Sequence, residues 1–336
     1  MRILPSIAVV SQQTRLTGLK ARWATAGAAS FRLKQVRAHA LELRAAAAPQ
    51  GGVATAPEDD SIDALAAFSE YEQEDLAYRR TFDLLRRELD FGYPISFVSR
   101  EHLPSFDFGR CPLVVVVGQD GLVANAAKYV GDVPIVAVNP DPKRFDGILL
   151  PFRVDQTRHA VRRTLENKAK LREVTLAEVN LNDGQRMLAF NDFFIGCQTH
   201  VSARYTLRVA AGSEPQSSSG LIVSTGAGST GWLSSMFNMA EGFAKWMGGQ
   251  LEPRPRLQWE DRRLLWVVRE PFRSKHSGAE LVAGVLEEKE LLIVESLMPN
   301  GGVIFSDGIE ADFLEFNSGT IGRLGVSRQR ARLVVG

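Results

Sequence analysis

The sequence predicts an α/β N-terminal domain with a parallel sheet, followed by a β-rich antiparallel C-terminal domain. In the first half, strand-like runs that are apolar on both faces alternate with helical segments, as in a parallel sheet covered by helices. From Val174 onward, short strand-like segments follow one another between Gly, Pro, Asn and Asp turns, which is typical of antiparallel sheets. We place the domains at residues 1–155 and 156–336, with a C-terminal tail that can return to the first domain.

The N-terminal half is expected to contain four strands and several helices. An Ala-rich helical stretch covers residues 15–48, and Ile62–Leu89 has the apolar spacing of one or two amphipathic helices. Between them, Pro49–Ser61 lacks periodicity and is interpreted as a flexible surface excursion. The strands are expected at Ile3–Val10, within YPISFVSREHLP, at Leu113–Val117 and at Ile135–Val138, where the last is ended by Asn139-Pro140.

The second half begins with one more predicted helix, Gln156–Arg172, which is rich in Arg and Lys. A further helix is expected around Leu233–Met247. The predicted strands are EVTLAEVNLND, RMLAFNDFFIG, ARYTLRVAA, SSGLIVST, LLWVVREP, ELLIVES and ARLVV.

Composition excludes several classes of partner. The 336 residues carry 40 basic and 39 acidic side chains, so a net charge of +1 gives no electrostatic reason to expect nucleic acid or a membrane surface. No apolar run approaches the roughly 18 residues of a transmembrane helix. The N-terminus resembles a first strand rather than a signal peptide, and Cys111 and Cys197 are interpreted as reduced core thiols. We therefore expect a cytoplasmic protein.

The turn Gly118-Gln119-Asp120-Gly121 stands where a buried strand passes into a helix. Ligands of parallel α/β sheets bind at such places, where glycines admit a ligand to the backbone and helix N–H groups favour phosphate. A carboxylate beside phosphate is unexpected unless a metal lies between them or it takes a proton from a nucleophile. Alternatively, Asp120 is only a helix N-cap. Both interpretations stay open on this turn alone.

A second glycine-rich segment, Gly226–Gly231, has the pattern G-x-G-x-x-G. Its position in the β-rich half argues against a Rossmann dinucleotide site, and no acidic strand end follows at about 20 residues. The hydroxyl groups among its glycines still suit a nucleotide; they belong to Ser224, Thr225, Ser229 and Thr230.

A third segment, Asn191-Asp192, interrupts the apolar run LAFNDFFIG. Polar residues in such a strand need partners, so this pair either caps a turn or faces a ligand with hydroxyl groups. The five histidines have no spacing that suggests zinc or a catalytic pair.

In this order, the three segments resemble the ATP-dependent NAD kinase family, within the larger group that includes diacylglycerol-type lipid kinases. That family carries GGDGT after a strand, then an Asn-Glu pair, then a loop of the type TPTGSTAY. The matching stretches here are Gly118–Leu122, Asn191-Asp192 and Thr225–Trp232. FSDGIEADFL, with Asp307-Gly308-Ile309, is similar to the Asp-Gly-Gln strand turn of the family.

The resemblance implies a two-domain kinase that transfers the γ-phosphoryl group of ATP to the 2′-hydroxyl of NAD with Mg²⁺, and that forms a homo-oligomer. Asp120 would take the hydroxyl proton, and no residue is assigned as a metal ligand. The residues assigned to nucleotide binding are Gly118, Gln119, Gly121, Asn125, Asn139, Asn191, Asp192, Thr225, Gly228, Ser229 and Thr230.

Several positions depart from the family pattern. Gln119 replaces a glycine, Leu122 replaces a threonine, and Asp192 is one methylene shorter than Glu. Two alternatives therefore stay open beside NAD phosphorylation. One is a kinase of the same fold that acts on a sugar, nucleoside or lipid hydroxyl, and the other is a non-catalytic sensor that binds NAD(P) or ATP.

Overall fold

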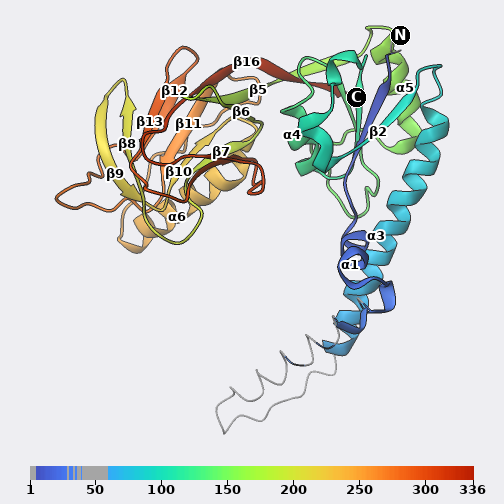
Figure 1. Ribbon diagram of the computed structural model, residues 1–336, viewed down its shortest axis with the longest axis horizontal. Helices are drawn as coiled ribbons and strands as arrows, with labels where there is room; N and C mark the ends of the chain where they lie inside the picture. The colour runs from blue at the N-terminus through green and yellow to red at the C-terminus, as the bar shows by residue number, and fades with distance from the viewer. Residues whose placement is uncertain (1–4, 29, 33–34, 36–38, 40–59) are drawn as a thin grey trace.

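The computed structural model describes residues 5–28, 30–32, 35, 39 and 60–336 (Figure 1). Four short strands form a parallel array in the order β2-β1-β3-β4. The residues of β3 and β4, and Ile7–Val10 of β1, are apolar and buried on both faces, as a helix-covered parallel sheet requires, whereas the edge strand β2 is partly exposed. The predicted parallel sheet is therefore confirmed; its strands are β1 Ile7–Ser11, β2 Ile95–Ser99, β3 Val114–Val117 and β4 Ile135–Val138.

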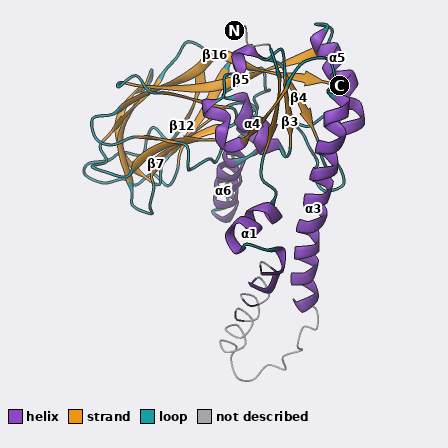
Figure 2. Ribbon diagram, turned by 45° about the vertical axis from the view of Figure 1, so that its right-hand side comes forward, coloured by secondary structure: helices purple, strands orange, loops and turns teal. Residues whose placement is uncertain are grey.

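Helices cover both faces of this parallel array (Figure 2). The helix α4 (Asp120–Ala127) packs on one face, and α3 (Asp60–Glu88) with α5 (Val154–Leu165) packs on the other. We call these strands and helices the N-terminal lobe. Helix α1 (Arg15–Trp23) and the first part of α3 project away from the lobe as a stem (Figure 1), and Leu16 and Phe68 pack together there. Most of the predicted surface excursion, residues 49–59, lies outside the described residues.

Two long strands pass from the N-terminal lobe into the second half of the molecule (Figure 1). They are β5 (Lys170–Leu181) and β16 (Ile321–Val335), which pair antiparallel over most of their lengths. The end of β16 lies parallel to β4, with Leu333 opposite Ile135, while its beginning pairs with β13. One ten-stranded sheet therefore continues through both halves.

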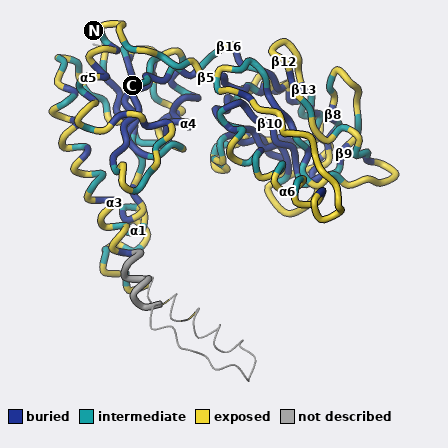
Figure 3. Tube along the Cα trace, turned by 180° about the vertical axis from the view of Figure 1, so that it is seen from behind, coloured by how far each residue is buried: buried dark blue, intermediate teal, exposed yellow. Residues whose placement is uncertain are grey.

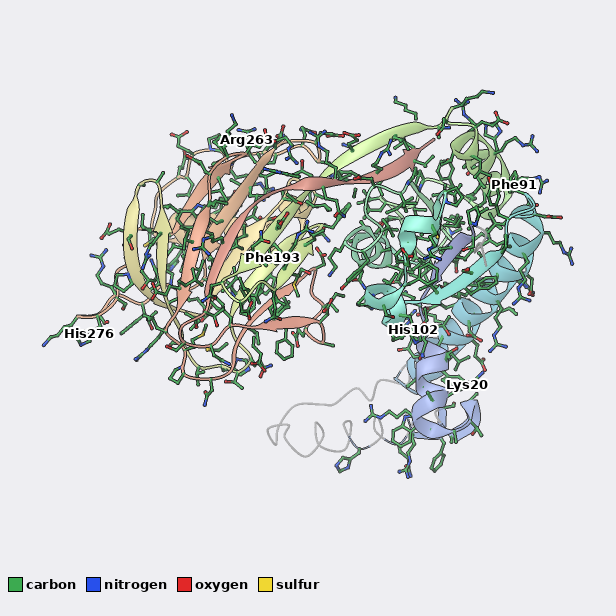
Figure 4. All side chains as sticks on the ribbon, turned by 45° about the horizontal axis from the view of Figure 1, so that its top comes forward. Lys20, Phe91, His102, Phe193, Arg263 and His276 are labelled. Atoms are coloured by element: carbon green, nitrogen blue, oxygen red, sulfur yellow. The ribbon has the colours of Figure 1, made fainter. Side chains whose placement is uncertain are left out.

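The C-terminal lobe is a sandwich of two sheets. One layer is the antiparallel continuation of the long sheet, and the other is a separate antiparallel sheet of order β12-β11-β10-β7-β14-β15. Phe193, labelled in Figure 4, is fully buried between the layers, as is Tyr205. Helix α6 (Trp232–Trp246) lies on the outside of the second sheet. The remaining strands are β6 Arg186–Ala189, β7 Asp192–Cys197, β8 Ala203–Val209, β9 Gly212–Ser218, β10 Leu221–Ser224, β11 Arg263–Val268, β12 Ala283–Glu287, β13 Leu292–Ser296, β14 Gly302–Ser306 and β15 Phe313–Glu315.

The helix predicted over Gln156–Arg172 is wrong in its last seven residues. Helix α5 ends at Leu165, and Asn167 adopts a left-handed backbone with φ 56°. The N–H groups of Lys168 and Ala169 then bond back to the carbonyl of Arg163, so the chain turns and enters β5 at Lys170. Helix α5 packs into the N-terminal core. We therefore propose a domain division nearer to residue 170 than to the predicted boundary at residue 155.

The buried residues form three large clusters: one on each face of the parallel strands in the N-terminal lobe, and one between the two sheets of the C-terminal lobe (Figure 3). In the part of the chain that the structure describes, no helix is both long enough and apolar enough to cross a membrane.

Candidate active site

The turn after β3 places Asp120 as the first residue of α4. The N-cap position is occupied by Gln119, whose side chain makes no capping hydrogen bond. Asp120 is therefore not the N-cap, and the capping alternative for this residue is wrong. Its carboxylate Oδ1 instead accepts a hydrogen bond of 2.7 Å from the backbone N–H of Leu149, in the loop that follows β4. An acidic group in the first turn is also favoured by the helix dipole.

The backbone at Gly118 is closely covered by a side chain. A Cβ atom at this position would lie 2.9 Å from Cδ2 of Leu122, so the side chain at the position of the family's threonine packs over the glycine. Gly121, in contrast, is exposed and has no atom within 4 Å of the place where its Cβ would lie. Only Gly121 therefore leaves open space beside the backbone of this turn.

A small hollow lies at the carboxyl ends of the parallel strands. Its volume is about 10 Å³, enough for about one water molecule, and its lining includes Gln12, Glu74, Gln119 and Asp141. The Tyr78 hydroxyl closes one side by donating to the carbonyl of Val117 at 2.6 Å. Burial raises the pKa of Tyr78 to about 12, so this hydroxyl stays protonated.

Two buried asparagines, both predicted to bind nucleotide, differ in what their amide groups contact. Asn139 accepts from the N–H of Asp141 at 3.0 Å and donates to the carbonyl of Phe145 at 3.0 Å, so it shapes the loop after β4. Asn125 is 4% exposed, and its Oδ1 has no partner among the described residues. Helical spacing places Asn125 on the same face of α4 as Gly121 and Lys128. Its unpaired oxygen is a candidate acceptor for a ligand donor.

Asn191 and Asp192 stand at the start of β7, and their backbone is held by Asp307. The Asp307 carboxylate accepts the N–H of Phe190 at 3.2 Å and of Asn191 at 2.6 Å. The backbone N–H of Asp307 donates to the carbonyl of Asp192 at 2.9 Å. Asp307 itself sits in a turn with φ 55°. The FSDGIEADFL turn and the Asn-Asp segment thus form one unit.

Asp192 is 7% exposed, and its carboxylate makes no hydrogen bond with another described residue. Burial, with a smaller contribution from the negative charge of Asp307, raises the pKa of Asp192 to about 7. A buried carboxyl without a partner is poised to accept hydrogen bonds from hydroxyl groups of a ligand.

The Gly226–Gly231 segment packs against its own chain. The N–H of Thr225 donates to the carbonyl of Asn191 at 2.8 Å, and its hydroxyl donates to the carbonyl of Phe190 at 2.6 Å. A Cβ at Gly226 would lie 1.9 Å from the carbonyl oxygen of Gln258, and one at Gly228 would lie 2.2 Å from that of Asn191. These glycines therefore permit close contact between backbone segments. The sequence pattern alone does not distinguish this packing role from ligand binding.

The two remaining residues predicted in this loop differ in accessibility. Ser229 donates its hydroxyl hydrogen to the carbonyl of Gly226 at 2.7 Å, whereas Thr230 is exposed. The segment follows an antiparallel strand, β10, which confirms that it is not a Rossmann loop.

Gly226→Ala is expected to lower the free energy of unfolding by about 1–3 kcal/mol, because the new methyl group would overlap the carbonyl of Gln258. Thermal unfolding followed by circular dichroism measures the change. Gly242→Ala is the matched control: Gly242 lies within α6 with no atom within 4 Å, and should gain up to about 1 kcal/mol. Equal melting temperatures for the two variants would contradict the close packing at Gly226.

The two lobes are linked by residues that sequence reasoning missed. Lys128, directly after α4, donates from Nζ to the Ser306 hydroxyl at 2.8 Å and lies 3.5 Å from the Asp307 carboxylate. The hydroxyl of the adjacent Tyr129 bonds to Asp312. The only signal in the sequence is a lysine in the otherwise small and apolar run VANAAKYV. Through Lys128, the helix that begins with Asp120 is joined to the turn that holds Asn191 and Asp192.

No group of three or more His, Cys, Asp or Glu side chains in the described ranges could hold a metal ion. His102 and His276 lie in different lobes (Figure 4), and Nδ1 of His102 is hydrogen-bonded with the nearby Ser99 hydroxyl.

Comparison with known proteins shows the fold. No family model and no curated protein matches the sequence. The structure of yeast NADH kinase complexed with NADH aligns with a TM-score of 0.53 and 16% identity, over 73% of this chain and 68% of that chain. An NAD kinase from Archaeoglobus fulgidus in complex with ATP aligns with a TM-score of 0.52 and 18% identity, over 76% and 88% of the two chains. The predicted NAD kinase-like two-domain fold is therefore confirmed.

Proposed function

We propose that this chain is a kinase that transfers the γ-phosphoryl group of ATP to the 2′-hydroxyl of NAD, giving NADP. One observation carries the proposal. Within an NAD kinase-like fold, the helix that starts with Asp120 is bonded through Lys128 to Asp307, which holds the Asn191-Asp192 segment. That segment in turn bonds to Thr225. The three sequence motifs thus belong to one bonded assembly at the junction of the lobes.

The proposed chemistry needs one group that accepts a proton. The 2′-oxygen of NAD would attack the γ-phosphorus of ATP, the bond from that phosphorus to the ADP oxygen would break, and the hydroxyl proton would pass to Asp120. The hydrogen bond from the N–H of Leu149 holds this carboxylate in place at the helix N-terminus. The buried Asp192 and the unpaired Oδ1 of Asn125 offer acceptors for ribose or adenine donors.

The side chains present fit a magnesium ion that arrives with the nucleotide. Mg²⁺ is commonly held by phosphate oxygens with one or two carboxylates, and Asp120 is such a carboxylate beside the proposed phosphate site. When bound, the ion would neutralise charge on the transferred phosphoryl group.

The direct test incubates the purified full chain with NAD, ATP and Mg²⁺ and measures the NADP that forms with an NADP-dependent dehydrogenase. We expect NADP to accumulate with a rate proportional to protein concentration. Polyphosphate replaces ATP in a parallel reaction, and a panel of sugars, nucleosides and lipids replaces NAD with ADP release as the readout. No NADP with any donor would reject the proposal, and ADP release with another acceptor would favour the alternative kinase.

One observation favours a second candidate, a non-catalytic NAD(P)- or ATP-binding sensor. Leu122 covers Gly118, and Gln119 lines a hollow of about 10 Å³ at the strand ends, so side chains stand where the family pattern has a glycine and a threonine beside the phosphates. Calorimetry distinguishes the two candidates: binding of NAD or ATP without any product after a long incubation supports the sensor. The predicted cytoplasmic location and self-association also stay predictions; light scattering of the purified chain measures the latter.

A further inference from the structure

Lys128 is the buried cation at the junction of the lobes. Its side chain is 3% exposed, and that of its ion-pair partner Asp307 is 2% exposed. Burial lowers the pKa of Lys128, and the carboxylate of Asp307 opposes this effect. A buried charge without a partner is costly. The ammonium group of Lys128 is stabilised by the Ser306 hydroxyl and the Asp307 carboxylate, and the buried carboxylate is stabilised by the ammonium group.

Asp307 is also hydrogen-bonded to the backbone around Asn191-Asp192. Its two carboxylate oxygens accept the N–H groups of Phe190 and Asn191, and its own N–H donates to the carbonyl of Asp192. The carbonyl of Asn191 then accepts the N–H of Thr225. A displacement of Asp307 would therefore move the backbone of both C-terminal motifs.

We propose that Lys128 is a positioning residue whose ammonium group, through Asp307, sets where Asn191 and Asp192 stand relative to Asp120. This inference rests on the proposed function in assigning the site to NAD. Lys128 lies eight residues after Asp120, roughly 12 Å along the helix axis, so it acts through Asp307 and not on the reacting atoms. A shift of about 1 Å in a substrate-positioning group is enough to slow a reaction strongly.

The first test does not depend on activity. In Lys128→Met, hydrogen exchange at the N–H groups of Phe190 and Asn191 is expected to become at least tenfold faster, because Asp307 loses the cation that holds it. Exchange within α5, on the far face of the N-terminal sheet, is expected to stay unchanged. Lys168→Met is the matched control, since Lys168 forms an exposed pair with Glu166 and contacts neither motif. Unchanged exchange at Phe190 and Asn191 in folded Lys128→Met would overturn the proposal.

The second test separates positioning from general damage. Lys128→Met is expected to raise the KM for NAD at least tenfold while the KM for ATP stays within twofold, because Lys128 does not line the hollow at the strand ends beside Gly118. An equal rise in both KM values would overturn the proposal. If the wild type forms no NADP, the proposed function fails, and the exchange measurement still decides the role of Lys128.

Ser306→Ala keeps the test available if Lys128→Met does not fold. This change removes one acceptor of the ammonium group and leaves the charge pair intact. Ser306→Ala should accelerate hydrogen exchange at the same N–H groups, those of Phe190 and Asn191, but by a smaller factor of about two to five. Exchange equal to that of the wild type would count against the proposal.

Discussion

Asp120→Asn is expected to lower kcat for phosphoryl transfer at least about 100-fold, which is the usual contribution of a general base. The substitution is informative because of the bond to Leu149. Asn retains an Oδ1 atom that accepts the N–H of Leu149, so the loop after β4 keeps its anchor while the group loses its negative charge. Initial rates of NADP formation measure the effect.

Asp120→Ala provides the matched comparison. It removes both the charge and the acceptor for Leu149, so it should also lower the melting temperature, which Asp120→Asn should change little. Full activity in Asp120→Asn would show that this carboxylate does not take the proton, even if the geometry of the site is unchanged.

Asp192→Asn is expected to stabilise the protein, and more strongly at pH 8 than at pH 5. The pKa of Asp192 is raised in the folded state to about 7 from 3.8, so the folded protein binds more protons than the unfolded chain between these values. Stability therefore falls as pH rises through this window, and the full cost of burying the charge is present above pH 7. At 1.36 kcal/mol per pKa unit, the gain on removing that charge is roughly 4 kcal/mol at pH 8 and less than half of that at pH 5.

Denaturant unfolding of the wild type and of Asp192→Asn at pH 5, 6, 7 and 8 measures this difference. Glu310→Gln, on the surface of the C-terminal lobe, is the control and should leave the pH dependence unchanged. A constant difference across the pH range would contradict a raised pKa. Under the proposed function, the stabilised variant should bind NAD more weakly, since active sites often retain unfavourable charges that binding relieves.

The strands and helices that the sequence predicted well have continuous or periodic apolar residues. Val114–Val117 and Ile135–Val138 are buried on both faces, so their composition alone indicates central parallel strands. Strand β9 (GSEPQSS) was missed because it is an edge strand, which needs no continuous apolar side. The end of α5 was misplaced because basic residues continue past Leu165, and only the backbone at Asn167 marks the turn.

The sequence predicted which residues belong to the candidate site, but it did not predict the contacts among them. The motifs located Asp120 and Thr225, which follow the ends of apolar strands, and Asn191, which interrupts an apolar run. The partners Lys128 and Asp307 are 179 residues apart in sequence, and no local pattern relates them. The glycines give a second example. The spacing of Gly226 and Gly228 suggested a bound ligand, but the space where their Cβ atoms would lie is filled by the backbone of Gln258 and Asn191.

The position of β16 has a consequence for the synthesis of the chain. It is the final strand in chain order, yet it stands between β4 and β13 in the long sheet. Until β16 has been synthesised, the edge of β4 that β16 covers at Ile135 is open, and exposed strand edges invite pairing with other chains. The nascent N-terminal lobe is therefore expected to need protection by a chaperone until β16 has been made. Removal of β16 should make the N-terminal lobe aggregate.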